Sequence, residues 1–467
     1  MANIDYTKLR SYLSQMLKNI VEHGLPSNNQ YRASRYYAGD DTSMAIHKAG
    51  VPLVVALPDP ENRKGSSFLL VDDGYDAHES FVDMLCNDEM INRQVGRKAI
   101  DLEIERLLRS FKNNGAVKDA EIAKEVKHSC ARLKGLVKTW RAVVPVDNLV
   151  LVGLTELTIG RVRLLQTASV IPSVLERSAL SIDVSSSSAH VKEGTKQTVW
   201  EVMSHNFGET KTCAELTVDA EVSRLPLIVD DEVDAALNIL RCFMSFLFPR
   251  GSRNYIGLRG EIISTWRPCL GMTADIGAWN LNLQQIGAMY AYELTPEKIE
   301  LLRKHCAFDT VCLALSKVSP PPTEFESTLL TASRWLGRGV VASDNAEKVL
   351  NLSVSLEKLV CGTQRDLIAD TLAKRLAFLI GTTKETRQFV NRRVKKLYGL
   401  RSKVVHEGTT EIAEEDVVEL ETIACTTFIK LAERAGEFTK DADFHNWVEE
   451  QMFTLPQDST EPTFSAQ

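Results

Sequence analysis

In the first part of the chain, two strand-like apolar segments are followed by apolar residues at helical spacing. The stretches 51–58 and 66–73 are rich in Val and Leu and are separated by the turn-forming run DPENRKG. Two amphipathic helices are predicted after them, over about 89–112 and 118–143. The apolar stripe of the first helix consists of Ile100, Ile104, Leu107, Leu108 and Phe111. We therefore expect residues 1–147 to form a mixed helical and strand region.

The middle of the chain changes to shorter apolar runs separated by turn residues. A helix that opens with acidic residues is predicted over about 230–248, since acids suit the positive end of a helix. The loop DVSSSSAHVKEGTK is expected to be exposed. Strands are predicted over 148–157, 160–171, 196–204, 214–222 and 254–265. We expect 148–318 to be a strand-rich region with a sensing or regulatory role.

Beyond the run SPPPTE, the pattern is helical to almost the end of the chain. Three consecutive prolines cannot lie inside a helix or a central strand, so a domain boundary is predicted there. Glycines at 362, 381 and 408 stand where helices are expected to stop. The predicted helices cover 324–338, 343–361, 365–380, 383–407, 412–436 and 441–452. Short connections indicate a bundle of antiparallel helices over 323–453, followed by a disordered tail at 454–467. The fold class expected for the whole chain is α+β.

Helix starts in this bundle carry capping residues. A Ser, Thr or Asp side chain at the N-cap accepts a hydrogen bond from a backbone N–H of the first turn. The predicted caps are Ser343 with Asp344, Thr382 with Glu385, and Thr410 with the acids that follow it.

Composition and charge place the protein among ordinary globular proteins. Of 467 residues, 44% are hydrophobic and 25% are charged, and the net charge of −7 excludes a protein that coats nucleic acid over its whole surface. The nine cysteines are scattered and never spaced C-x-x-C, which argues against a disulfide framework or a cysteine zinc site. The start of the chain lacks the apolar block of a signal peptide, and no apolar run reaches the roughly 18 residues of a membrane helix. We expect a cytoplasmic protein that does not enter membranes.

One arginine stands where an apolar residue would be expected. In the segment KKLYGLRSKVVHEG, a helical wheel places Arg401 at the centre of an apolar stripe that includes Val394, Leu397 and Val404. A buried arginine is costly unless it is paired or faces an anion. His406 follows five residues later, about 140° around the same helix. The two side chains could meet through a distorted last turn or across two copies of the chain.

The surroundings of this arginine are basic. Seven basic residues and no acid lie between positions 386 and 406. A solvated basic face with a snorkelling arginine is one interpretation. RNA cleavage is the other, because histidine can move a proton near neutral pH while arginine binds phosphate oxygens as a fork.

The segment LYGLRSKVVHEG resembles the signature of HEPN domains of the Apea-like family. The resemblance extends upstream through SRWLGRGVVASDNAEKVLNLSVSLEKLV and LAKRLAFLIG and covers about 325–435. It implies a dimerising helical bundle and a metal-independent endoribonuclease without a cofactor. The family role of catalytic arginine falls on Arg401 and that of catalytic histidine on His406. Ser402, Glu357 and Tyr398 take supporting positions, and Glu357 is the first candidate partner for Arg401. RNA binding is assigned to Arg392, Arg393, Lys395, Lys396 and Lys403.

The resemblance also implies a biological setting, and it has one departure. It suggests an effector of prokaryotic anti-phage defence, abortive infection or a toxin-like system. Host RNA, tRNA included, or the RNA of an invader would be the substrate, and residues 1–318 would bind a phage-derived trigger. Glu407 is inserted where the family commonly has glycine directly after the histidine, which puts the efficiency of cleavage in question. Trp335, Leu336 and the helix at 343–361 are nominated for the contact between two copies.

Other interpretations compete with this one. The HEPN bundle could be a non-catalytic module that binds RNA or dimerises, with recognition in the N-terminal region. An enzyme in 1–318 is a third hypothesis, but the chain has no P-loop, H-E-x-x-H, G-x-S-x-G or Rossmann motif. The run NNQYRASRYY mixes tyrosines with arginines and could stack bases, although an ordinary loop is the more common explanation. An acidic loop could hold a cation or be a solvated turn, and its residues are Asp72, Asp73, Asp76, His78 and Glu79.

Overall fold

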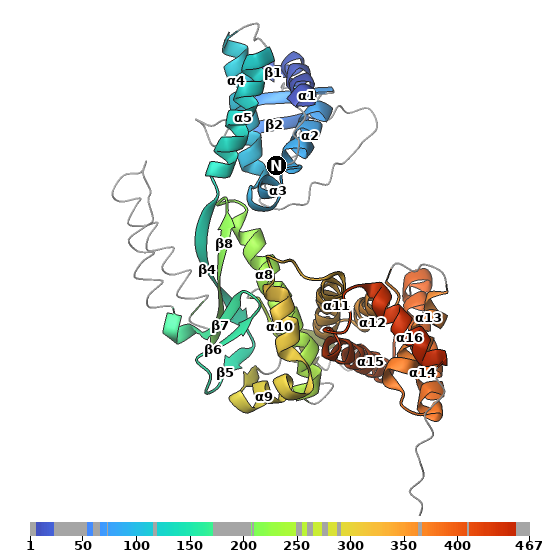
Figure 1. Cartoon of the computed structure of the whole chain (residues 1–467). Coiled ribbons are helices and arrows are strands. Elements are labelled where there is room, and N and C mark those ends of the chain that lie inside the picture. The colour runs from blue at the N-terminus through green and yellow to red at the C-terminus, as the bar shows by residue number, and fades with distance from the viewer. Residues whose placement is uncertain are drawn as a thin grey trace, which may run out of the picture. The chain divides into compact units, whose positions relative to one another are not determined.

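The computed structural model shows an α+β protein, as the sequence predicted (Figure 1). It describes residues 6–22, 54–58, 66–71, 73–114, 119–170, 207, 210–248, 255–258, 265–272, 279–286, 291–362, 367–408 and 411–453. Several predictions lie wholly or largely outside these residues. They are the turn at 59–65, the tyrosine- and arginine-rich run at 28–37, the loop at 183–196, the strand at 196–204, the cap at Thr410 and the tail at 454–467.

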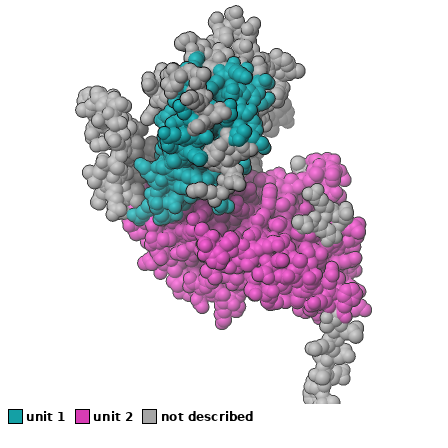
Figure 2. All heavy atoms as spheres, turned by 45° about the horizontal axis from the view of Figure 1, so that its top comes forward, with its two compact units in different colours: residues 1–142, 217–229 teal, residues 143–216, 230–467 magenta. Residues whose placement is uncertain are grey.

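The chain forms two compact units (Figure 2). Unit 1 contains 1–142 and 217–229, and unit 2 contains 143–216 and 230–467. The first break lies close to the predicted boundary at 147. The predicted boundary at 318–323 separates no units, because the strand-rich region and the C-terminal helices belong to one compact unit.

Unit 1 packs helices against a small antiparallel sheet. The strands β1 (Ile20–Glu22), β3 (Ser66–Val71) and β2 (Val54–Pro58) lie in that order. The helices are α1 (Tyr6–Lys18), α2 (Asp73–Cys86), α3 (Glu89–Gln94), α4 (Arg97–Asn114) and α5 (Asp119–Gly135). The stripe predicted from Ile100 to Phe111 is buried in the core with residues of the other helices.

The predicted helix at 89–112 is two helices that meet at Gly96. The Gly96 N–H donates to Glu221 Oε2 at 3.2 Å. A Cβ added at Gly96 would lie 2.1 Å from Ser223 Oγ and 2.9 Å from Glu221 Oε2, so a larger residue would require these side chains to move. The break therefore depends on a segment 125 residues away, which helical periodicity cannot reveal.

The predicted helix at 118–143 is too long. It ends at Gly135, and the chain continues as strand β4 (Lys138–Asp147). Trp140 Nε1 donates to the carbonyl of Ala220 at 2.8 Å, and Thr139 Oγ1 donates to Asp219 Oδ1 at 2.6 Å. Pairing with a distant strand overrides the local apolar pattern that favoured a helix.

A five-stranded sheet, whose strands β6, β7 and β9 lie wholly in unit 2, has the order β6-β7-β8-β4-β9. Its other strands are β6 (Glu156–Ile159), β7 (Val162–Gln166), β8 (Thr212–Ala220) and β9 (Gly257–Leu258). A parallel pair joins β5 (Leu149–Leu151) to β12 (Tyr292–Leu294), and a hairpin joins β10 (Thr265–Met272) to β11 (Trp279–Ile286). The strands predicted at 148–157, 160–171 and 214–222 are thus confirmed in position, the first being divided into two.

The predicted helices of unit 2 are all present. The helix expected at 230–248 is α8 (Leu225–Leu247), and α9 (Pro296–His305) and α10 (Phe308–Ser316) follow the strands. The C-terminal helices are α11 (Glu324–Val341), α12 (Asn345–Val360), α13 (Ile368–Ile380), α14 (Lys384–Glu407), α15 (Glu414–Glu433) and α16 (Asp441–Phe453). Asp344 caps α12 as predicted, while Thr383 with Thr386 caps α14 in place of Thr382 with Glu385. The N-cap of α15 is Ala413, whose side chain makes no capping bond.

A shared core explains why the predicted boundary at 318–323 does not divide unit 2. The Phe243 ring of α8 lies 5.4 Å from that of Phe308 in α10 and 5.7 Å from that of Phe428 in α15. In the same helix, Asn238 approaches Gly337 of α11 so closely that a Cβ added there would lie 2.4 Å from its Oδ1. Helix α8 therefore packs among the C-terminal helices, and the proline-rich linker joins two parts of one core.

Candidate functional site

Arg401 and His406, which form an R-x4-H motif, lie on one regular helix. The Thr383–Thr386 capping box begins α14, and Gly408 ends it in the left-handed conformation with φ 66°. Because α14 continues through Glu407, Arg401 and His406 keep the ideal separation of about 140°. Of the two arrangements left open by the sequence, the distorted last turn is therefore absent.

Arg401 contacts the partner that the sequence nominated. Its Nε lies 3.0 Å from Glu357 Oε1, in the adjacent helix α12. The Tyr398 hydroxyl donates to the same oxygen at 2.8 Å. The ion pair includes no hydrogen bond at Nε, although that atom is buried. Glu357 therefore fixes one side of the guanidinium by charge while Tyr398 holds the carboxylate in place.

The electrostatics of this cluster keep Tyr398 as a donor. Burial raises the pKa of Tyr398, and its hydrogen bond to the Glu357 carboxylate and the charge of that carboxylate raise it further. The hydroxyl therefore stays protonated through the physiological pH range. The guanidinium carbon of Arg401 lies 5.8 Å from the centre of the Tyr398 ring, which adds a cation–π contact.

Arg401 lies at the border of the apolar stripe and not at its centre, which corrects the sequence prediction. Only Val394 and Leu397 of α14 are buried. Val404 is half-buried and Val405 is 52% exposed, while the Arg401 side chain is 30% exposed. The apolar face ends near Leu397, so the charged end of Arg401 reaches solvent without the full cost of burial.

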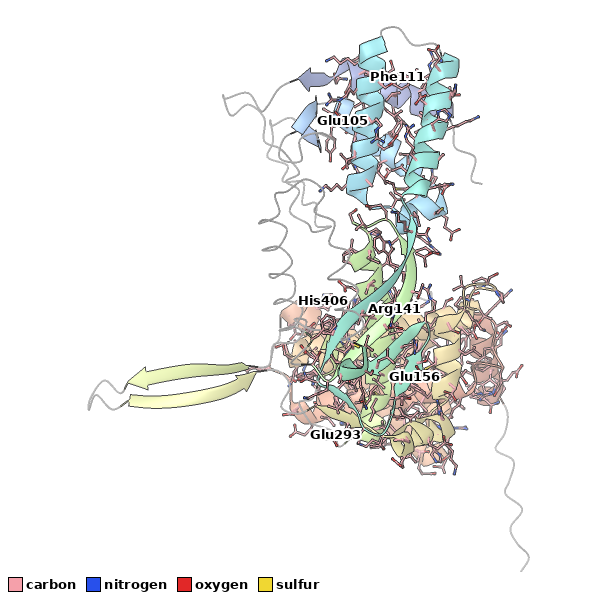
Figure 3. The ribbon with its side chains drawn as sticks, turned by 90° about the vertical axis from the view of Figure 1, so that its left-hand side faces the viewer. Glu105, Phe111, Arg141, Glu156, Glu293 and His406 are labelled. Carbon is pink, nitrogen blue, oxygen red and sulfur yellow. The ribbon has the colours of Figure 1, made fainter. Side chains whose placement is uncertain are left out.

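His406 is exposed in the last turn of α14, where Figure 3 labels it. Ser402 and Glu407 are exposed as well, so a substrate can reach the histidine but none of these three contributes to the core. The structure thus brings Arg401, Glu357 and Tyr398 together and leaves His406 and Ser402 outside that cluster.

Three of the five predicted RNA-binding residues are paired with acids from neighbouring helices. Lys395 Nζ lies 2.5 Å from Asp370 of α13, and Lys396 Nζ lies 2.9 Å from Asp416 of α15. Arg393 binds Glu419 through its Nε at 2.7 Å. The basic window is therefore partly neutralised by acids that lie outside it in the sequence. The acid-rich sequence EEDVVELE at the start of α15 was the available signal.

Two predicted RNA-binding residues keep an unopposed charge. Arg392 and Lys403 are exposed, and neither has an ion-pair or hydrogen-bond partner among the residues described. Of the residues nominated for a contact between copies, Leu336 is fully buried in the core and cannot serve, whereas Trp335 is 36% exposed.

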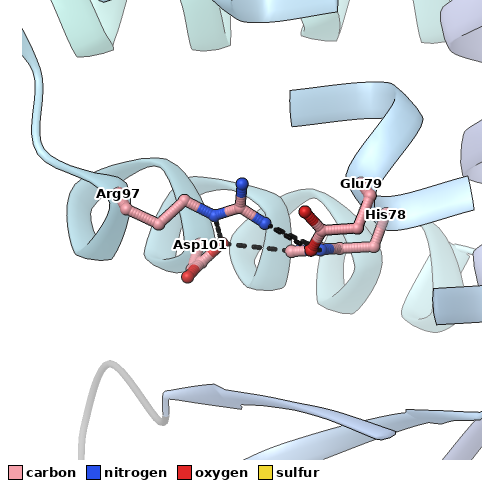
Figure 4. A network of polar contacts seen from close by, with 4 residues as sticks. All are labelled: His78, Glu79, Arg97 and Asp101. Atoms are coloured by element: carbon pink, nitrogen blue, oxygen red, sulfur yellow. Dashed lines mark hydrogen bonds and ion pairs between the residues drawn. The ribbon is translucent and has the colours of Figure 1, made fainter. Parts of the chain in front are cut away.

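The described residues of the predicted acidic loop, from Asp73 to Glu79, lie in the first two turns of a helix, and their histidine is buried; Asp72 lies outside the described residues. His78 lies in α2, and its Nε2 is 3.1 Å from Asp101 Oδ1 of α4 (Figure 4). Its Nδ1 is 3.3 Å from Glu79 Oε1 and 3.2 Å from Arg97 Nη2. The solvated-turn interpretation is wrong for His78, because packing of α2 on α4 takes it out of water, whereas Asp73 and Asp76 are exposed as predicted. In the described part of the chain, no group of three or more His, Cys, Asp or Glu residues is placed to hold a metal.

This buried network predicts that stability depends on pH. Burial lowers the pKa of His78, but the hydrogen bonds to Asp101 and Glu79 and the charge of Asp101 outweigh it, so the pKa lies above its ordinary 6.5. His78 therefore stabilises the fold most below pH 6.5, and that contribution is lost as pH rises through the raised value. We expect the free energy of unfolding of the wild-type protein to exceed that of the His78→Gln variant by about 1–3 kcal/mol at low pH. The difference should be smaller at high pH.

Chemical unfolding of both proteins between about pH 5 and pH 9 measures this difference, because the interval spans the titration of a histidine. Glutamine keeps a neutral donor for Asp101, so the comparison isolates the proton. A difference that stays constant with pH would contradict the expectation.

No protein-family model matches the chain, and no curated protein or solved structure is significantly similar to it. The resemblance to Apea-like HEPN domains therefore rests on the motif residues and their sequence context. None of the helices within the described ranges is long and apolar enough to cross a membrane.

Proposed function

We propose that the protein is a metal-independent endoribonuclease whose active site contains Arg401 and His406. The observation that carries the proposal is a half-buried arginine, held by Glu357 and Tyr398, on the same helix as an exposed histidine. An arginine that is fixed on one side and reaches solvent on the other is suited to bind a phosphate. A histidine at the end of the same helix is suited to move a proton.

The chemistry follows from these two side chains. The 2′-hydroxyl of the RNA attacks the neighbouring phosphorus, and the bond from phosphorus to the 5′-oxygen breaks. The His406 of one copy takes the proton of the 2′-hydroxyl. The His406 of the second copy donates a proton to the 5′-oxygen as this oxygen leaves. Arg401 stabilises the charge on the other phosphate oxygens. The products are a 2′,3′-cyclic phosphate and a 5′-hydroxyl.

Two copies of the chain supply what one copy lacks. Because Arg401 and His406 point about 140° apart on a regular helix, a compact site forms more readily between two chains. Two copies also bring two histidines, one as the base and one as the acid. We therefore include a homodimer, or a higher homo-oligomer, in the proposal.

The biological role that we propose is that of an effector in prokaryotic anti-phage defence, abortive infection or a toxin-like system. In this role the protein acts in the cytoplasm on host RNA such as tRNA, and residues 1–318 bind a phage-derived trigger. The separate compact core of unit 1 supports a division between sensing and cutting.

The deciding experiment incubates purified protein with total RNA in the presence of excess EDTA. We expect cutting to persist, because Arg401 and His406 supply the charge and the proton transfer. Mapping of the ends should find 2′,3′-cyclic phosphate and 5′-hydroxyl groups. Cutting that stops in EDTA and returns with magnesium or manganese would overturn the metal-independent mechanism.

A non-catalytic RNA-binding or dimerisation module is the second candidate. The observation that favours it is that Arg393, Lys395 and Lys396 are neutralised and that Glu407 adds a negative charge beside His406. Expression in a bacterial host separates the two candidates. The nuclease predicts toxicity that His406→Ala relieves, whereas the module predicts equal growth with either protein.

A further inference from the structure

A groove between α13 and α14 is lined by several cations, and none of its lining residues that the structure describes is acidic. It encloses about 350 Å³ and lies in unit 2. Its lining residues are Lys374, Ala377, Phe378, Arg387, Gln388, Asn391 and Arg392. Three of these are cations, two are side-chain amides and none is acidic, so the groove attracts anions.

The cations of the groove differ in how they are held. Lys374 and Arg392 are exposed, and within the described residues neither has an ion-pair or hydrogen-bond partner. The guanidinium carbon of Arg387 lies 4.4 Å from the centre of the Phe378 ring, and its Nε donates to the carbonyl of Gly381 at 3.1 Å. Arg387 is thus held by two neighbours, and a guanidinium plane can stack on an unpaired base.

A second groove in the same unit has the opposite charge. It encloses about 410 Å³ on α15 and is lined by Glu414, Glu415, Val418, Glu419 and Thr422. Acids on this surface repel a polyanion, and α15 also supplies the acids that neutralise Arg393 and Lys396. The two grooves therefore differ in charge: acids line the one on α15, and cations line the one between α13 and α14.

The basic groove shares a face of α14 with the motif histidine. Relative to Arg392 on a helical wheel, Lys403 lies at about +20° and His406 at about −40°. The distance along the helix from Arg392 to His406 is about 21 Å, at 1.5 Å per residue. Gly399 lies between them on this face, and a Cβ added there would meet nothing within 4 Å. A strand bound in the groove can therefore follow open surface to His406.

We infer that this groove binds the phosphate backbone of single-stranded RNA on one side of the cleavage position. Lys374 and Arg392 contact phosphates, Arg387 stacks on a base, and Lys403 guides the strand toward His406. This inference rests on the proposed nuclease function and adds the path of its substrate. It assigns a binding role to Lys374 and Arg387, which the motif does not include.

The test uses the full-length chain with Lys374→Glu and Arg392→Glu combined. Both residues are exposed and unpaired, so the fold should be unaffected. The control combines Lys211→Glu with Lys304→Glu, which are also exposed in unit 2 and change the net charge equally. Figure 1 shows α9, which carries Lys304, well apart from α14.

Two measurements separate this inference from the nuclease proposal. The first is binding of a fluorescent single-stranded RNA by anisotropy in a His406→Ala background, where no cutting is expected. We expect the groove variant to raise Kd at least about tenfold at low salt. The slope of log Kd against log salt should fall by about 1.4, the value for two lost phosphate contacts. The second is cleavage kinetics, where KM should rise and kcat stay near wild type.

Each outcome has a distinct meaning. If the wild-type protein cuts RNA, but the groove and control variants have the same Kd, salt slope and KM, the groove does not bind RNA. The nuclease proposal would be unaffected by that result. If RNA is never cut, but its binding is lost only in the groove variant, the nuclease proposal is wrong. The groove would then be supported as an RNA-binding site. Wild-type protein that fails to bind RNA would overturn the groove.

Discussion

Replacing His406 by alanine is expected to abolish RNA cleavage and to leave the folded protein intact. A positioned acid or base contributes about 10²–10⁴-fold to rate, and a composite site would lose both of its histidines. His406 is exposed in the last turn of α14, so its removal should change the free energy of unfolding by no more than about 0.5 kcal/mol. Cleavage rates on a fluorescent RNA and thermal melting measure the two effects.

His305→Ala is the matched control for this variant. His305 is also an exposed histidine in the last turn of a helix, α9, in the same unit. We expect it to cut at the wild-type rate. His406→Ala protein that cuts as fast as His305→Ala would contradict the assignment of the catalytic histidine.

Mixing experiments extend this prediction to the composite site. Under conditions of subunit exchange, excess His406→Ala protein should lower the activity per wild-type chain, because mixed dimers hold one histidine. The same excess of His305→Ala protein should not. A purified monomer that cuts at full rate, unaffected by added mutant, would contradict a site shared between chains.

Replacing Phe243 by alanine is expected to destabilise unit 2 by about 3–5 kcal/mol, the usual cost of removing a buried phenylalanine. Phe243 is fully buried and touches the rings of Phe308 and Phe428, so the loss leaves a cavity among three helices. Phe246→Ala on the same helix α8 is the control, because Phe246 is 50% exposed. Denaturant unfolding of the three proteins measures the difference.

Hydrogen exchange shows whether α8 and the C-terminal helices unfold together. In Phe243→Ala, amide protection should fall in α11 and α15 as well as in α8, because the three helices share one core. If amide exchange in Phe243→Ala becomes faster only in α8 and the strands, these elements unfold separately from the C-terminal helices. That result would support the domain boundary that the sequence predicted at 318–323.

The sequence by itself determined the order and type of the C-terminal helices. Their apolar stripes repeat every 3.6 residues, and their ends carry local signals such as Asp344 and Gly408. Local signals are sufficient here because a helix is held by bonds between near neighbours in the chain. The ion pair of Arg401 with Glu357 was also predicted, from the resemblance of the segment to HEPN domains together with the need of a partly buried cation for an anion.

Only the tertiary structure decided which charges are opposed and which residues are buried. Lys395 meets Asp370, and Lys396 meets Asp416, because α14 packs between α13 and α15, not because of spacing within its own sequence. Contacts between elements far apart in the sequence also explain why His78 is buried, why the predicted helix is interrupted at Gly96, and why Phe243 packs among the C-terminal helices. Each of these outcomes depends on partners remote in sequence, and no periodicity within one segment carries that information.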